Sequence, residues 1–173
     1  MKFQISNLKL QYPYLCAAMI QYFKNINGVT TAIEKADDET WVNILPPLKH
    51  EEFAEVSETL EIPVEFLQDS LDIDERSRFE LENNVKLIVI KTPTENNSFN
   101  ESDSFYITIP ICIILTHNQI VTVNSFENGA IKKFLNTFQN RHPGKKNMMV
   151  VKIFEKITQT YMEYLKEINH RRN

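Results

Sequence analysis

The longest apolar stretch of this chain runs from Ile107 to Leu115 and is interrupted only by Thr108. Its nine residues are about half of the ~20 that a helix needs to cross a bilayer, so it is too short for a transmembrane helix. The segment Val85–Lys91 is also nearly continuously apolar and β-branched, a composition typical of strands. These two segments predict strands in the core of a globular domain.

Other segments with alternating or β-branched residues lie between turn signals. The sequence predicts strands at Met19–Lys24, Val29–Glu34, Thr40–Leu45, Phe79–Glu82, Phe105–Leu115 and Ile120–Asn124. Asn27-Gly28 joins the first two strands as a hairpin, because Asn-Gly tolerates positive φ. Pro110 lies inside one predicted strand and cannot donate to a ladder, which predicts an edge position or a bulge there.

Three segments carry apolar residues at helical spacing and are predicted to be helices: Lys49–Leu60, Pro63–Leu71 and Gly129–Gln139. The first has glutamates near its start, where the helix dipole favours negative charge. Pro63 suits the first turn of the second helix, and Leu67 and Leu71 belong to its apolar stripe.

The last segment, from Met148 onward, has apolar residues spaced alternately four and three apart over about three heptads. We call these residues the seam: Val150, Phe154, Ile157, Tyr161, Tyr164 and Ile168. One interpretation is the start of a long coiled-coil helix, which would leave the seam exposed in the isolated chain. The other is a terminal helix whose seam packs on its own sheet, and periodicity alone leaves both open.

The chain shows no internal repeat and no second domain before this terminal helix. We divide it into an N-terminal extension at residues 1–18, a domain of strands and helices at 19–147, and the terminal helix at 148–173. The extension is a poor signal peptide, because polar residues such as Gln4, Ser6 and Lys9 interrupt any apolar core.

Composition argues against several classes of function. The 19 Lys and Arg residues against 23 Asp and Glu give a net charge of −4, without the basic excess of a nucleic-acid-binding protein. Gly28, Gly129 and Gly144 are the only glycines and lie too far apart for a G-x-G-x-x-G turn or a Walker phosphate loop. Cys16 and Cys112 form no C-x-x-C motif, which favours a reducing compartment.

Catalytic motifs are missing as well, so the sequence predicts no enzyme. The four histidines share no metal-ligand spacing: His50, His117, His142 and His170. Cys112 and His117 lie on one predicted hairpin, but burial of Cys112 in an apolar strand would raise the pKa of its thiol and make it inert. The chain has no G-x-S-x-G elbow for a serine hydrolase.

Acidic residues in and after the second predicted helix are the remaining chemical signal. Their carboxylates are the hard oxygen ligands that Mg²⁺ and Ca²⁺ prefer, and the four-then-three spacing of the first three places those on one helix face. These candidate metal ligands are Glu65, Asp69, Asp72, Asp74 and Glu75. The alternative is a solvated acidic face that Arg76 and Arg78 partly neutralise.

Three sequence blocks, in order, resemble the CorA family of divalent-cation transporters. The first is Trp41–Pro47 (WVNILPP), followed by Glu51-Glu52. The second is Ile62–Glu80, and the third is Thr108–Thr116 followed by Ile120–Val123. The resemblance runs from near Met19 to the C-terminus.

This resemblance implies an α/β fold, with a mixed β-sheet flanked by helices and the start of a long stalk helix at residues 148–173. It implies the cytoplasmic domain of a Mg²⁺ transporter, with Co²⁺, Ni²⁺ and Zn²⁺ left open as alternative ions. The full-length protein would be a homopentamer at the cytoplasmic face of the cell membrane. Its membrane helices are absent from this chain, and no nucleic acid partner is implied.

The resemblance also implies a Mg²⁺-sensing role for Asp69. The matching aspartate in the family lies between neighbouring subunits and shares Mg²⁺ with an acid on the adjoining stalk, which here is expected beyond Asn173. The other four candidate ligands come from the residue pattern alone. The rival interpretation is a freestanding α/β interaction module or an unrecognised enzyme, in which the seam would be buried.

Overall fold

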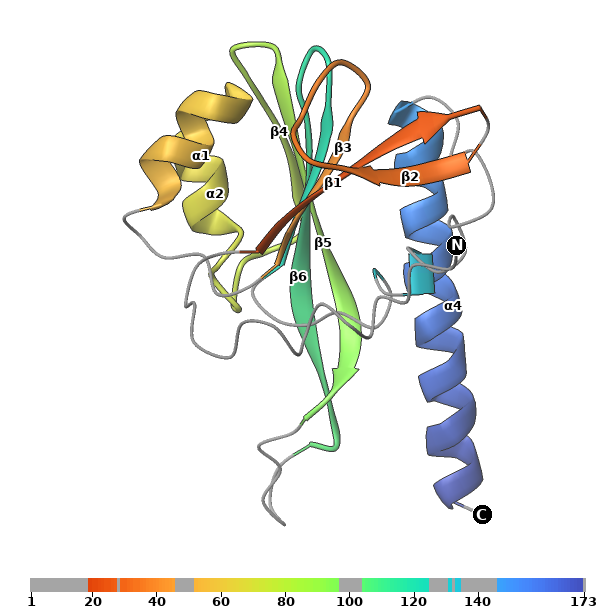
Figure 1. The fold of residues 1–173 in the computed structure, drawn as a ribbon. Helices are drawn as coiled ribbons and strands as arrows, with labels where there is room; N and C mark the ends of the chain where they lie inside the picture. The colour runs from red at the N-terminus through yellow and green to blue at the C-terminus, as the bar shows by residue number, and fades with distance from the viewer. Residues whose placement is uncertain are drawn as a thin grey trace, which may run out of the picture.

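The computed structural model describes residues 19–27, 29–45, 52–96, 104–124, 131, 133–134 and 146–172. The predicted extension, most of the predicted helix Gly129–Gln139, and Cys16, His50 and His142 lie outside these residues. The described residues form a seven-stranded sheet with helices on both faces (Figure 1), which confirms the predicted α/β fold class.

The strands follow the order β2-β1-β3-β7-β6-β5-β4 across the sheet. They are β1 (Met19–Ile26), β2 (Val29–Ile33), β3 (Trp41–Leu45), β4 (Arg78–Glu82), β5 (Val85–Glu95), β6 (Tyr106–Leu115) and β7 (Ile120–Asn124). Neighbours pair antiparallel except β3 and β7, which pair parallel and make the sheet mixed. Asn27 has a φ of 54°, as the predicted β1–β2 hairpin turn requires.

Helices α1 (Phe53–Leu60) and α2 (Val64–Asp69) lie on one face of the sheet, and α4 (Lys146–Arg172) lies on the other (Figure 1). Successive side chains of a strand point to opposite faces. Val42 and Ile44 of β3 therefore pack in the core cluster of α1 and α2, whereas Trp41 packs in the cluster of α4. The sheet thus separates two hydrophobic cores.

Pro110 lies in an interior strand, because β6 is placed between β7 and β5. It faces Lys91 of β5, but the described pairs of β6 with β7 end at Ile111↔Asn124. The proline is one residue beyond the last described pair of β6 with β7. The predicted edge position is therefore wrong, because β6 is an interior strand of the sheet.

A buried polar network crosses the sheet on the α4 side. The indole N–H of Trp41 donates to Thr122 Oγ1 at 3.0 Å, and the Thr122 hydroxyl donates to Asn43 Oδ1 at 2.8 Å. Asn43 Nδ2 donates in turn to Gln21 Oε1 at 3.1 Å. These bonds satisfy buried polar groups on β3 and β7, with the half-buried Gln21 of β1 at one end, and help to fix the register of the parallel pair.

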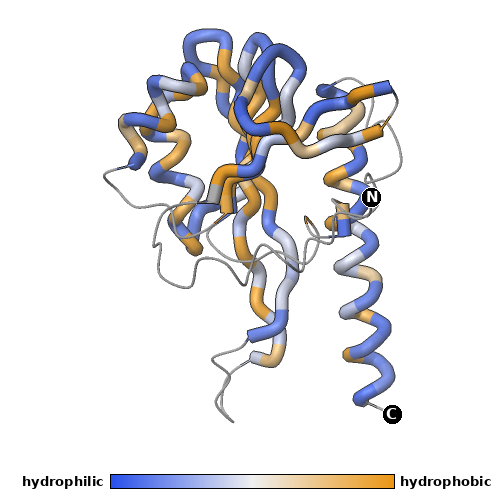
Figure 2. Tube along the Cα trace, in the orientation of Figure 1, coloured by the Kyte–Doolittle hydropathy of each residue, from blue (hydrophilic) through white to orange (hydrophobic). Residues whose placement is uncertain are grey.

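The seam of α4 faces the sheet from Val150 to Tyr164. Val150 and Ile157 are buried in the same core cluster as Trp41. The Tyr161 hydroxyl donates to the Lys91 carbonyl of β5 at 3.3 Å. Ile168 is 42% exposed, although the last turns still contact the start of β6, where the rings of Tyr164 and Tyr106 have centroids 4.7 Å apart. Figure 2 shows that the end of α4 is largely hydrophilic. The structure therefore selects packing on the sheet for the seam as far as Tyr164, and Ile168 is its exposed end.

Candidate functional site

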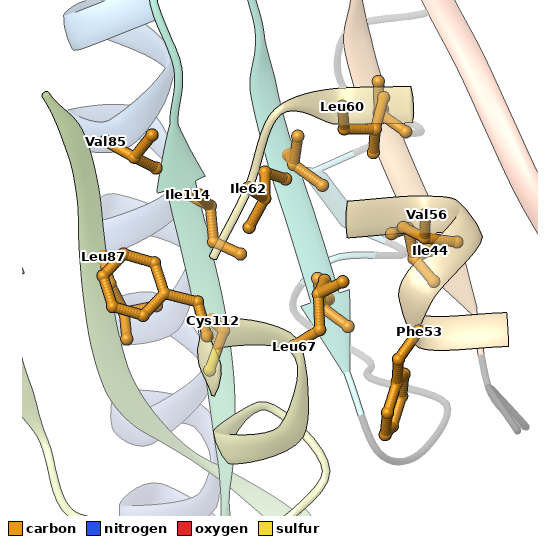
Figure 3. Close-up of a cluster of buried hydrophobic side chains, with 14 of the residues drawn as sticks. Ile44, Phe53, Val56, Leu60, Ile62, Leu67, Val85, Leu87, Cys112 and Ile114 are labelled. Carbon is orange, nitrogen blue, oxygen red and sulfur yellow. The ribbon is translucent and has the colours of Figure 1, made fainter. Parts of the chain in front are cut away.

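Asp69 is the last residue of α2, a short helix that two core side chains hold in place. Phe66 and Leu67 are buried in the core cluster shown in Figure 3. Ser70 follows, and its hydroxyl donates to the Leu67 carbonyl at 2.6 Å. The backbone of Asp69 is thus held in place by Phe66 and Leu67, which lie within one helical turn of it. The carboxylate of Asp69 stays at the surface.

The Arg78 guanidinium holds the carboxylates of three acidic residues. Its Nη2 pairs with Asp69, its Nη1 with Glu75, and its Nε with Glu80 Oε2 at 3.1 Å. We call these four residues the Arg78 cluster. The Asp69 side chain is 35% exposed and the Arg78 side chain 29%, so the cluster lies at the surface between α2 and β4.

The contacts of Arg78 with these carboxylates raise its pKa. Burial by itself would lower the pKa of the guanidinium, but hydrogen bonds to Glu80 and Asp69 and the charge of Glu75 raise it above its ordinary value. Arg78 therefore stays charged at every physiological pH. The four residues together carry a formal charge of −2, so one guanidinium only partly neutralises them.

The other predicted ligands do not join this cluster. Asp72 and Asp74 are exposed in the turn after α2, where Asp72 Oδ1 accepts the Asp74 N–H at 2.9 Å. Glu65 is exposed and lines an open pocket of about 590 Å³ together with other acids, among them Glu58 and Glu82. Within the described residues, no group of three or more His, Cys, Asp or Glu side chains is arranged to hold a metal ion.

Asp69 nevertheless fits the chemistry of a hydrated Mg²⁺ site. Mg²⁺ keeps several waters and binds proteins through one or two carboxylates rather than through a closed cage. The half-exposed carboxylate of Asp69 supplies one hard oxygen ligand that an ion and its waters can reach. A complete site requires a second carboxylate, and the cation has to compete with Arg78.

Sequence reasoning named Arg78 only as a neutralising charge and did not identify Glu80 as its partner. Residues two apart on a strand share a face, and Arg78 and Glu80 are two apart on β4. This spacing is the signal that could have revealed the pair. The other predicted neutralising residue, Arg76, is exposed.

Cys112 has no catalytic partner in His117, which is exposed in the turn after β6. Cys112 is fully buried in the core cluster of α1 and α2 (Figure 3). Burial raises the pKa of its thiol to about 12, so the thiolate needed for nucleophilic attack is almost absent at neutral pH. The prediction that Cys112 lies in the core is confirmed.

In a Cys16→Ser variant, where Cys112 is the remaining thiol, a disulfide reagent at pH 8 should react only as fast as the core opens. A thiol with a pKa of about 12 is ionised in about one molecule in 10⁴ at that pH. Because folding raises this pKa, the thiol's contribution to stability persists below about pH 9 and is lost as pH rises toward 12. Absorbance of the released thiolate follows the reaction, and immediate stoichiometric labelling of the folded chain would contradict the burial.

In the part of the chain that the structure describes, no helix is both long and apolar enough to span a membrane.

Comparisons with known proteins agree with this fold. A model of the family described as CorA-like Mg²⁺ transporter protein matches residues 37–173. The soluble domain of CorA from Methanocaldococcus jannaschii superposes with a TM-score of 0.72 at 21% identity, over 91% of this chain and 63% of that one. The complete CorA magnesium transporter from the same organism gives 0.71 at 21% identity, over 90% and 49%.

The ZntB cytoplasmic domain from Vibrio parahaemolyticus is also similar, with a TM-score of 0.69 at 16% identity over 89% of this chain and 63% of that one. A search of curated proteins gives no match. The chain spans less than two thirds of the soluble domains that it resembles. Since the family match covers most of the sequence, the chain belongs to the family of CorA-like Mg²⁺ transporter proteins.

Proposed function

We propose that this chain is a cytoplasmic, Mg²⁺-sensing domain of a CorA-like divalent-cation transporter. The observation that carries the proposal is the family match over residues 37–173, which includes α2 and the Arg78 cluster. The complete transporter to which the chain is similar contains about as much protein again outside the aligned region, because that region covers 49% of it. Ion conduction would belong to that other part, and we infer no enzymatic role here.

Asp69 is the proposed sensor residue. In an assembly of identical subunits, carboxylates that meet across an interface repel one another unless a cation offsets them. A Mg²⁺ ion shared between Asp69 and an acid of a neighbouring subunit would favour the symmetric assembly, and its loss would loosen that assembly. Asp69 supports this role because it is both anchored through α2 and accessible.

The proposed assembly is a homopentamer at the cytoplasmic face of the membrane. The second half of α4 supports an association role, since Met162, Leu165 and Ile168 are each more than two fifths exposed. These side chains offer apolar surface to a neighbouring copy or to further segments of a longer protein. The proposed role of residues 148–173 as the start of a stalk rests on this half of the helix.

The test is Asp69→Asn in the full-length transporter that carries this domain. The change removes the charge but keeps the side-chain shape, so the Mg²⁺ concentration for half-maximal protection from protease should rise about tenfold, or about 1.4 kcal/mol. Asp72→Asn is the matched control, because it removes the same charge from an exposed residue three positions away. An equal response of both variants, or no response of Asp69→Asn, would remove the sensor assignment.

A further inference from the structure

We propose that Arg78 is an internal competitor of the divalent cation, so that Asp69 exchanges a guanidinium of its own chain for a metal ion. This inference rests on the proposed sensor function of Asp69 and adds the interaction that sets its affinity for the ion. Arg78 would thereby determine the ion concentration at which the sensor responds.

The geometry supports competition because the guanidinium and a metal ion need the same oxygens. Arg78 Nη2 is paired with Oδ2 of Asp69, one of the two atoms through which that carboxylate can bind a cation. In the part of the chain that the structure describes, Arg78 is the one basic side chain shown in ion pairs with Asp69, Glu75 or Glu80. A divalent cation near Asp69 would also be repelled by the guanidinium, so binding favours withdrawal of Arg78.

Arg78 can release Asp69 without losing all its partners. Glu75 and Glu80 hold the other two sides of the guanidinium, at Nη1 and Nε. The planar fork of arginine allows such separate contacts to three carboxylates, which the single ammonium of lysine does not reproduce. Ion pairs with partly exposed side chains contribute little to stability, so the exchange at Asp69 is energetically accessible.

The experiment is a Mg²⁺ titration of the 173-residue chain by isothermal calorimetry, comparing the wild type with Arg78→Met. The wild type is expected to bind at about millimolar concentration, as few-carboxylate sites do. Arg78→Met should bind about tenfold more tightly, equal to about 1.4 kcal/mol. In the wild type, the NMR signals of the Arg78 guanidinium should shift as Mg²⁺ saturates the site.

Two further variants separate competition from a general charge effect. Arg76→Met removes the same charge from an exposed arginine two residues away and should change the affinity less than about twofold. Adding Asp69→Asn to Arg78→Met should abolish the gain in affinity, because the gain requires the released carboxylate.

Arg78→Lys keeps a positive charge but lacks the planar fork of arginine, so it should bind Mg²⁺ with an affinity between those of the wild type and Arg78→Met. This variant replaces Arg78→Met in the test if Arg78→Met does not fold. Unchanged affinity in Arg78→Met, or in Arg78→Lys where only that variant folds, would overturn the competition. A gain in Mg²⁺ affinity that persists when Asp69→Asn is added to Arg78→Met would also overturn the competition.

Failure of this inference is distinguishable from failure of the sensor function. If Arg78→Met binds Mg²⁺ more tightly but Asp69→Asn does not change protease protection, the competition is supported and the sensor function is rejected. If Asp69→Asn changes protease protection but Arg78→Met does not bind Mg²⁺ more tightly, the sensor function is supported and the role of Arg78 is rejected.

Discussion

Replacing Leu67 with alanine is expected to lower the free energy of unfolding by about 3 to 5 kcal/mol. Leu67 is fully buried in the core cluster of α1 and α2 (Figure 3), and truncation removes its apolar contacts and leaves a cavity. The loss is large beside the 5 to 15 kcal/mol that stabilises an ordinary domain. Urea unfolding monitored by circular dichroism measures it, and the midpoint should fall while the slope stays constant.

Gln68→Ala is the matched control for Leu67→Ala. Gln68 is the next residue of α2 and its side chain is exposed, so its truncation should change the free energy of unfolding by no more than about 0.5 kcal/mol. A small loss in Leu67→Ala would mean that α2 is not anchored by the core. Asp69 would then lack the fixed position on which both proposals depend.

Local sequence patterns were sufficient to locate the strands but not to order them. Val85–Lys91 and Ile107–Leu115 are interior strands. β6 is buried on both faces from Ile109 to Leu115, whereas β5 buries mainly the face of Val85, Leu87 and Val89. The parallel pair of β3 and β7 joins residues as far apart as Asn43 and Thr122, 79 positions along the chain. No local periodicity contains such a contact, and the fold class came from the family resemblance.

The candidate site was predictable only where its residues lie on regular elements. The spacing of Glu65, Asp69 and Asp72 predicts a shared face only if the helix continues, but α2 ends at Asp69. Asp72 instead lies in the following turn and accepts the N–H of Asp74. The Arg78 cluster forms because β4 returns beside the end of α2, which is a tertiary contact that the sequence pattern does not contain.

The seam shows why periodicity could not distinguish a stalk from a packed helix. Spacing of four and three places six side chains on one face in either case. The structure buries Val150 and Ile157 of that face and leaves Ile168 exposed, although the end of the helix still contacts β6 through Tyr164 and Arg171. The tertiary contacts of each turn, which the repeat does not contain, decide which seam residues are covered.

Ile157→Ala is expected to lower the free energy of unfolding by about 2 to 5 kcal/mol, whereas Ile168→Ala should change it by no more than about 0.5 kcal/mol. Both residues belong to the seam, but Ile157 is 2% exposed and Ile168 is 42% exposed. The pair is matched, since each variant makes the same truncation on the same helix face. Urea unfolding at low protein concentration measures both.

Varying the protein concentration then tests whether the exposed end of α4 faces water or a second copy of the chain. If Ile168 faces water in solution, the small effect of Ile168→Ala should not change between about 1 and 100 μM chain, because unimolecular unfolding has no concentration term. A loss in Ile168→Ala that grows with concentration would show that Ile168 is buried between copies. The final turns of α4 would then be part of an association surface, as the proposed oligomer requires.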